Sequence, residues 1–175
     1  GGYFGTKDIA IFHSVVDVVG FNPLVIDVLK RGAGAICGMA EMGEGSNFFT
    51  KTAQKKDLIA LTEFKFSEEC CSHVRRLLEE KGFEVIPFHA QGIGDRAMED
   101  LIGEGFFQGV MDIVPAGVGE ELLRGNRAAG PNRLENAGQL GIPQIIAPCG
   151  FDMISCGPLE RSDRGDPLWV SKDIK

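Results

Sequence analysis

The chain has 175 residues, of which 43% are hydrophobic and 25% charged, a composition ordinary for a globular protein with one sizeable core. Its net charge of −7 argues against a nucleic-acid partner, because binding to a phosphate backbone needs a basic surface. No apolar run approaches the roughly 20 residues of a membrane-spanning helix, so we expect no membrane partner.

The cysteines indicate the compartment and exclude one kind of site. They are odd in number and lack the spacing of a disulfide framework, which favours a reducing, cytoplasmic location. No two of them are separated by two residues, and the three histidines lie far apart, so no metal site is predicted. The cysteines are Cys37, Cys70, Cys71, Cys149 and Cys156.

Apolar runs and helical patterns alternate along the chain. Asn22 and Pro23 predict the start of the first helix, because asparagine caps helices and proline suits the first helical position. Five buried strands are expected at residues 8–14, 57–62, 83–88, 110–114 and 142–147. Helices are expected at residues 23–39, 67–81, 95–104, 115–123 and 132–139.

This alternation predicts the fold class. Continuously apolar strands are typical of a parallel sheet that is covered on both faces. We therefore expect a three-layer, doubly wound α/β fold of the Rossmann-like kind, with a mainly parallel sheet of about five strands. One domain should cover residues 1–156, and residues 157–175 should form a polar tail or an edge element.

The second predicted helix carries a cysteine that needs an interpretation. Ser67 is expected to cap the helix, and Cys70 falls on an apolar stripe with Val74 and Leu77. A cysteine near a helix start can have a lowered pKa, but a place on that stripe favours simple burial.

The stretch from Val85 to Leu101 (VIPFHAQGIGDRAMEDL) is the most informative motif of the chain. It predicts a strand, a glycine turn at Gly92 and Gly94, and a helix that starts near Asp95. Backbone amides at such a turn can bind a phosphate or a carboxylate. However, Asp95 would compete for the same amides, and the motif lacks the third glycine of a dinucleotide fingerprint.

If the strands are parallel, their loops meet at one edge of the sheet, where ligands bind in open α/β folds. The loops expected there contain His13, Glu63, His89, Gly117 and Cys149 with their neighbours. We expect a small-molecule anion as the ligand. The predicted ligand-binding residues are Ser14, Asp17, Gln91, Gly92, Ile93, Gly94, Arg96 and Asp152.

His13 and His89 each end a predicted strand. They could act as acid and base, since histidine titrates near neutral pH. The alternative is that each imidazole is hydrogen-bonded to nearby backbone. Whether the chain is an enzyme is left open at this point.

Four segments resemble a little-characterised family of nucleotide-binding proteins that includes the tomato mosaic virus resistance protein. They are DIAIFHSVVDVVGFN (8–22), GAGAICGMAE (32–41), FEVIPFHAQGIGDRAME (83–99) and AAGPNRLENAGQLGIPQIIAPCGFDMISCG (128–157). The resemblance implies two successive Rossmann-like domains, of which this chain resembles the second.

The resemblance also bears on cofactors and ends. It implies that the family's ATP site lies mainly in the first domain, so no cofactor is expected in this chain, and that the second domain continues past the end of the chain. The family tends toward a Gly/Thr-rich loop where this chain has residues 63–69, and toward glycine where Asp95 stands. Both departures place bulk or negative charge where a phosphate would lie.

Three functions follow as hypotheses. The first is a small-ligand-binding domain of this family that associates with itself or with a first domain. The second is an enzyme that uses His13 and His89 on a small anionic substrate. The third is an interaction module that uses the helix face at Gly34 and Gly38 together with Phe48 and Phe49.

Overall fold

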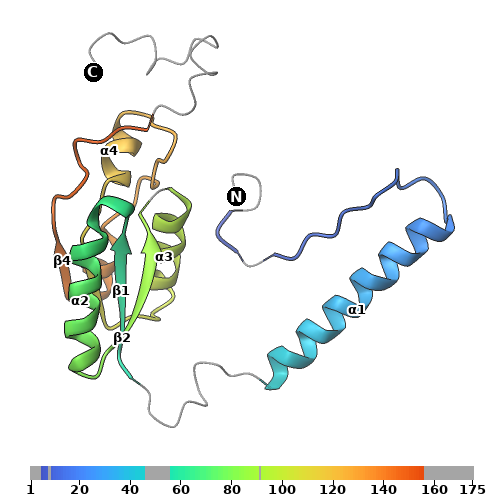
Figure 1. The fold of residues 1–175 in the computed structure, drawn as a ribbon, viewed down its shortest axis with the longest axis horizontal. Coiled ribbons are helices and arrows are strands. Elements are labelled where there is room, and N and C mark those ends of the chain that lie inside the picture. Colours follow the sequence, from blue (N-terminus) through green and yellow to red (C-terminus); the bar gives the residue numbers. More distant parts are fainter. Residues whose placement is uncertain (1–4, 8, 46–55, 91, 156–175) are drawn as a thin grey trace. The chain divides into compact units, whose positions relative to one another are not determined.

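The computed structural model describes residues 5–7, 9–45, 56–90 and 92–155. By its internal contacts the chain divides into two compact units, one of residues 1–7 with 56–175 and one of residues 8–55. Figure 1 shows both units. The predicted tail at residues 157–175 lies outside the described residues.

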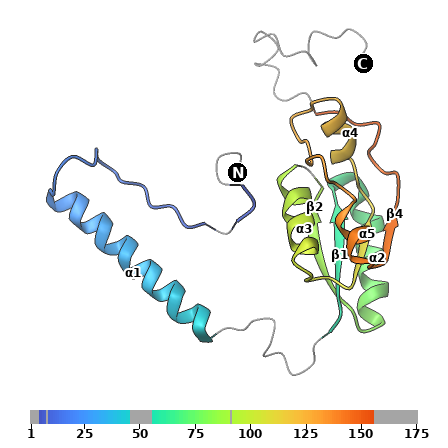
Figure 2. The same cartoon turned by 180° about the vertical axis from the view of Figure 1, so that it is seen from behind.

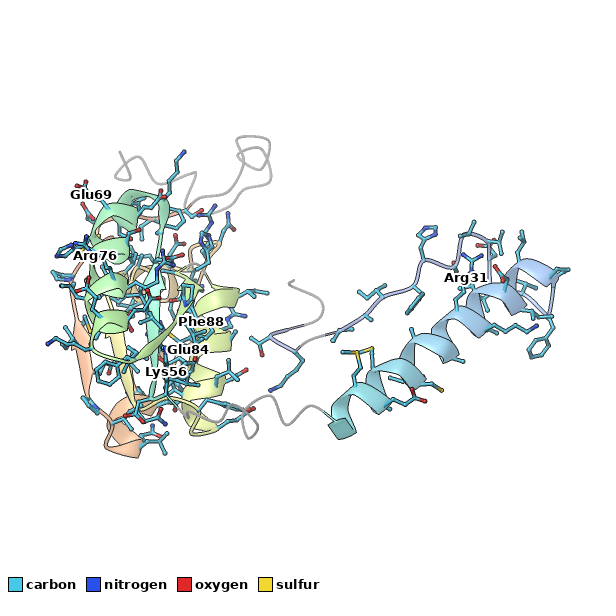
Figure 3. All side chains as sticks on the ribbon, turned by 60° about the horizontal axis from the view of Figure 1, so that its bottom comes forward. Arg31, Lys56, Glu69, Arg76, Glu84 and Phe88 are labelled. Atoms are coloured by element: carbon cyan, nitrogen blue, oxygen red, sulfur yellow. The ribbon has the colours of Figure 1, made fainter. Side chains whose placement is uncertain are left out.

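The unit of residues 8–55 contains helix α1 (Pro23–Gly45). The Asn22 side chain caps it as expected, because its Oδ1 accepts the N–H groups of Leu24 at 3.1 Å and Val25 at 3.0 Å. On the exposed face of α1, Arg31 pairs with Asp27 at 2.6 Å (Figure 3). Large apolar side chains are also exposed here: Ile9, Ile11, Phe12, Val15, Val18, Val19, Phe21, Leu24, Leu29, Ile36, Met39 and Met42.

The strand expected at residues 8–14 is wrong for its described part, since residues 9–14 form no strand. A strand is stabilised by a backbone partner, and no described strand pairs with this segment. The described sheet therefore has four strands, one fewer than expected.

The second unit contains the sheet. Its strands are β1 (Leu58–Glu63), β2 (Glu84–His89), β3 (Gly109–Asp112) and β4 (Gln144–Ile146), in the spatial order β2-β1-β3-β4. All neighbouring strands are parallel. The expected parallel α/β architecture is thus confirmed, with all carboxyl ends at one edge (Figure 1).

Helices cover both faces of this sheet, as Figures 1 and 2 show from opposite sides. On one face, α2 (Glu68–Glu80) packs over the core that contains Leu61 and Val85. On the other face, α3 (Ile93–Gly103) and α5 (Asn136–Leu140) pack over the core that contains Ala60. Alternate β1 residues thus enter different cores, because successive side chains of a strand point to opposite faces.

The start of α2 differs from the sequence prediction. Ser67 ends the short 3-10 helix η1 (Lys65–Ser67) and makes no side-chain cap on α2; its hydroxyl donates to the Phe64 carbonyl at 2.9 Å. The buried cysteine is Cys71, whereas Cys70 is exposed. Val74 packs against the core as predicted, whereas the prediction of burial was wrong for Cys70 and Leu77, which are exposed. Glu69 and Arg76 project from the outer face of α2 (Figure 3).

The glycine turn forms at Gly92, but α3 begins at Ile93, two residues before the predicted start at Asp95, so Gly94 lies in the first turn of the helix. Gly92 has a φ of 64°, which an L side chain rarely adopts. Gly94 lies against the backbone of His89, so that a Cβ at this position would overlap the His89 carbonyl oxygen. The turn therefore requires both glycines. The remaining helix, α4 (Gly117–Leu122), follows β3.

Candidate functional site

Four loops meet at the carboxyl edge of the sheet, one after each strand. Together they enclose a hollow of about 200 Å³. We call it the aromatic hollow, after the two phenylalanines in its wall. Its lining residues are Phe64, Phe66, Ala90, Ala116, Gly117, Glu120, Arg127, Met153, Ile154 and Ser155.

Aromatic rings from the loop after β1 form one wall. The rings of Phe64 and Phe66 are 4.8 Å apart and tilted by 59°. The ring of His89, at the end of β2, lies 5.1 Å from Phe64. Tilted ring contacts at these distances are favourable, and they hold this wall of the hollow in place.

Glu120, from α4, holds the opposite wall in place. Its carboxylate accepts the backbone N–H of Ser155 at 2.6 Å and that of Arg127 at 3.3 Å. The side chain is buried, and such charge-assisted bonds are stronger than neutral ones. Glu120 thus ties the loop before Arg127 to the segment after β4.

Arg127 supplies the free charge at the hollow. Its side chain is exposed, and within the described part of the chain its guanidinium has no ion-pair partner. Each oxygen of the Glu120 carboxylate already accepts one backbone N–H. The hollow therefore combines an apolar, aromatic body with one available cation.

Beside the hollow, on the α3 face of the sheet, lies a buried charged network that we call the Arg133 cluster. Arg133 donates from Nε to Asp95 at 2.9 Å, from Nη1 to Glu99 at 3.1 Å and Asp112 at 2.6 Å, and from Nη2 to Asp112 at 2.7 Å. Thr62 donates to Asp112 at 2.8 Å and accepts the N–H of Val114 at 3.0 Å. The cluster joins α3, two strands and the loop before α5.

Burial sets the electrostatics of this cluster. Burial raises the pKa of the Asp95 carboxyl, more than the charge and hydrogen bond of Arg133 lower it. Burial alone would lower the pKa of Arg133, but hydrogen bonds and charges from Asp112 and Asp95 raise it above its ordinary value. Arg133 is thus charged at any pH at which the protein folds.

Asp95 also occupies the glycine turn. Its Oδ2 accepts the N–H of Gly92 at 2.9 Å, as the competition between carboxylate and phosphate suggested. The Gly92 amide is therefore used within the fold. Arg96 donates from Nη2 to the Ala128 carbonyl at 2.7 Å and does not line the aromatic hollow.

The structure brings some of the predicted residues near one another and leaves others unrelated. His89 is exposed at the end of β2, and Asp152 is exposed in the turn after β4. His13, Ser14 and Asp17 belong to the other unit, where His13 Nδ1 accepts the N–H of Val15 at 2.9 Å. Gln91, Phe48 and Phe49 lie outside the described residues. The catalytic and ligand-binding roles assigned from sequence stay predictions.

Sequence reasoning missed the residues that define both sites. Arg133, Glu99 and Thr62 were not singled out, nor were Phe64 and Arg127. One signal was available: Asp112 interrupts the apolar run GVMDIV, and a carboxylate inside a buried strand needs a partner. The run PNRLEN, which contains Arg133, carries no comparable signal.

No helix of the described chain contains an apolar stretch long enough to cross a membrane. Among the same residues, no group of three or more His, Cys, Asp or Glu side chains is arranged to hold a metal ion.

The fold and its strand-edge hollow define a three-layer α/β domain with a parallel sheet, of the Rossmann-like kind. Residues 56–165 match the C-terminal domain of the uncharacterised protein family UPF0261, and residues 1–45 match the N-terminal domain of that family. The chain belongs to the UPF0261 family.

Individual relatives agree with this assignment. A UPF0261 protein of Clostridium tetani is 41% identical over 158 residues, which cover 90% of this chain and 38% of the relative. The ToMV resistance protein Tm-1 of Solanum lycopersicum is 34% identical over 156 residues, or 89% of this chain and 21% of that protein. A Brucella melitensis UPF0261 protein is 38% identical over 77% of this chain and 31% of its own length. The chain thus spans well under half the length of these relatives.

Proposed function

We propose that the sheet-containing unit is a ligand-binding domain, and that its ligand is a small anionic molecule with an apolar, preferably aromatic, body. The observation that carries this proposal is the aromatic hollow at the carboxyl ends of parallel strands, the usual ligand position in open α/β sheets. A volume of about 200 Å³ lies below the roughly 300–1,000 Å³ of drug-sized sites, so the ligand should be small.

The charge of the ligand follows from the side chains around the hollow. Arg127 is the one cation that lines the hollow, and it has no ion-pair partner among the described residues, whereas Glu120 already accepts two backbone donors. A carboxylate suits the planar guanidinium, which can donate two parallel hydrogen bonds. The rings of Phe64 and Phe66 would contact the apolar body of the ligand.

Calorimetry with benzoate and phenylacetate, compared with neutral benzyl alcohol, tests the proposal. The acids should bind and the alcohol should bind more weakly. Arg127→Gln should weaken binding of the acids by about ten- to a hundredfold, the usual value of a hydrogen bond to a charged group. Arg124→Gln is the matched control, because Arg124 is exposed nearby but does not line the hollow. Equal binding of acids and alcohol, or no effect of Arg127→Gln, would contradict the proposed ligand class.

We infer a second function, association, for the unit of residues 8–55. It is supported by the exposed apolar side chains of that unit, such as Leu29 and Ile36 of α1, and by the match of residues 1–45 to an N-terminal domain. We propose an N-terminal domain of the same family as the partner, in the cytoplasm.

Size-exclusion chromatography with the separately produced N-terminal domain of the Clostridium tetani relative tests this association. Co-elution that Ile36→Ser abolishes and Lys30→Ser leaves intact would support it, since both residues are exposed on α1 and only Ile36 is apolar. Self-association of the chain without binding of the N-terminal domain would contradict this partner and would show that the unit mediates homo-oligomerisation instead.

A further inference from the structure

A second hollow, of about 370 Å³, lies over α3 on the side of the loop that leads to α5. We call it the polar hollow. Its wall includes charged and amide side chains: Arg96, Glu99, Asp100, Asn132, Arg133 and Asn136. It shares no lining residue with the aromatic hollow.

Glu99 has one carboxylate oxygen without a partner. Its Oε1 accepts from Arg133 at 3.1 Å and from the N–H of Leu134 at 2.8 Å. Its Oε2 is buried and has no hydrogen-bond partner among the described residues, while the residue is 6% exposed. An unsatisfied buried carboxylate oxygen is costly, so a donor at this position would be strongly favoured.

The charge of the surrounding side chains indicates the charge of the donor that Glu99 Oε2 lacks. Arg133 is the one cation that pairs with the three buried carboxylates of Asp95, Glu99 and Asp112, which leaves a formal charge of −2 when all four are ionised. Every other carboxylate oxygen of the cluster has a donor. Protonation of Asp95 would remove one negative charge and still leave Glu99 Oε2 without a partner.

Two basic side chains of the described residues are engaged elsewhere. Arg96 lines the polar hollow but donates to the Ala128 carbonyl, and Lys7 pairs with Glu104 at 3.3 Å. We do not propose a divalent metal, because the described residues offer no group of three or more His, Cys, Asp or Glu side chains placed to hold one. The complementary chemistry is therefore an organic N–H donor with a positive charge.

We propose that the polar hollow binds the ammonium group of a small primary amine, which donates to Glu99 Oε2. Asn132 and Asn136 line the same hollow and supply amide oxygens for its remaining N–H groups. Asn136 is oriented for this by its Nδ2, which donates to the Glu99 backbone carbonyl at 2.8 Å. The site is independent of the aromatic hollow and of its proposed anionic ligand.

Titration of the protein with ethylammonium chloride tests this proposal, with tetramethylammonium chloride and sodium chloride at equal ionic strength as controls. Tetramethylammonium carries the same charge but has no N–H group. We expect a saturable rise in melting temperature with ethylammonium alone. Equal rises with all three salts would show a general ionic effect and would overturn the proposal.

Glu99→Gln removes the charge at the site, and we expect it to weaken ethylammonium binding about tenfold or more. Glu135→Gln is the matched control, because Glu135 is exposed beside the hollow and does not line it. Unchanged binding in Glu99→Gln would overturn the proposal.

If Glu99→Gln does not fold, the amide chemical shifts of the wild-type protein test the same proposal. Ethylammonium should shift the amide of Leu134, which donates to the Glu99 carboxylate. Shifts confined to residues away from the polar hollow would overturn the proposal. Benzoate binding, measured in parallel, separates failure here from failure of the aromatic site.

Discussion

The carboxyl edge of the sheet carries two neighbouring sites that are built in opposite ways. On the α3 side, the buried Arg133 cluster fills the space next to Gly117, and Arg133 pairs with three carboxylates there. On the other side of Gly117, the aromatic hollow stays open, with Glu120 tied to backbone and Arg127 without an ion-pair partner among the described residues. Charged residues at a strand edge therefore stabilise the fold where they are paired and buried. Where they are exposed and unpaired, they remain available to a ligand.

Removing the centre of the filled site should give the largest effect. Arg133→Met leaves three buried carboxylates without their cation, which should lower the free energy of unfolding by about 3–5 kcal/mol. Urea denaturation measures the loss. Arg127→Met, at the open site, should change stability by no more than about 0.5 kcal/mol. Similar losses of unfolding free energy in the two variants would contradict the distinction between the two sites.

The glycine turn supports the filled site through close packing. Gly94→Ala would place a Cβ on the His89 carbonyl oxygen, and we expect a loss of about 1–3 kcal/mol. Gly138→Ala, in α5 with open space around its Cα, should instead raise stability by about 0.5–1 kcal/mol. Thermal unfolding compares the two, and a tolerated alanine at residue 94 would argue against the described turn.

The pH dependence of stability reports the cost of burying Asp95. Because its pKa is raised in the folded state, the folded protein binds this proton more tightly than the unfolded chain, so stability falls as pH rises from the ordinary pKa of 3.8 through the raised value. Asp95→Asn removes this titration. The free energy of unfolding of Asp95→Asn relative to wild type should therefore increase with pH across that window, whereas parallel curves would contradict the account.

Adjacent cysteines give the smallest effect, a difference in reactivity. Cys70 is exposed, whereas Cys71 is fully buried and burial raises the pKa of its thiol. Since the thiolate is the reactive form, iodoacetamide should alkylate Cys70 in the native protein and Cys71 only after unfolding. Mass spectrometry of the labelled peptides distinguishes the two, and early labelling of Cys71 would show that α2 is turned differently.

The fold was more predictable than the site because its signals are local. Apolar runs and the Gly92 turn predicted four parallel strands and their helices, and Asn22 predicted the start of α1. The strand at residues 8–14 failed because an apolar run reports burial tendency and not a pairing partner. The one-residue error at Cys70 and Cys71 arose because both positions fit an apolar stripe until the packing of α2 on the sheet is known.

The site depended on contacts between distant residues. Arg133 meets Asp95 across 38 positions of sequence, and Thr62 meets Asp112 across 50. A polar residue in a loop, such as Arg127, looks the same in sequence whether it lines a hollow or faces solvent. The convergence of loops was predictable from the parallel sheet, but the side chains that fill or leave open the space between them were not.

The most direct test of the open site is an amide chemical-shift map of the protein with phenylacetate. We expect shifts at Ala90, Gly117 and Ser155, which come from three different loops and line the aromatic hollow together. Shifts centred instead on the Gly92 turn and α3, with none at these three residues, would place the ligand on the α3 side and contradict binding in the aromatic hollow.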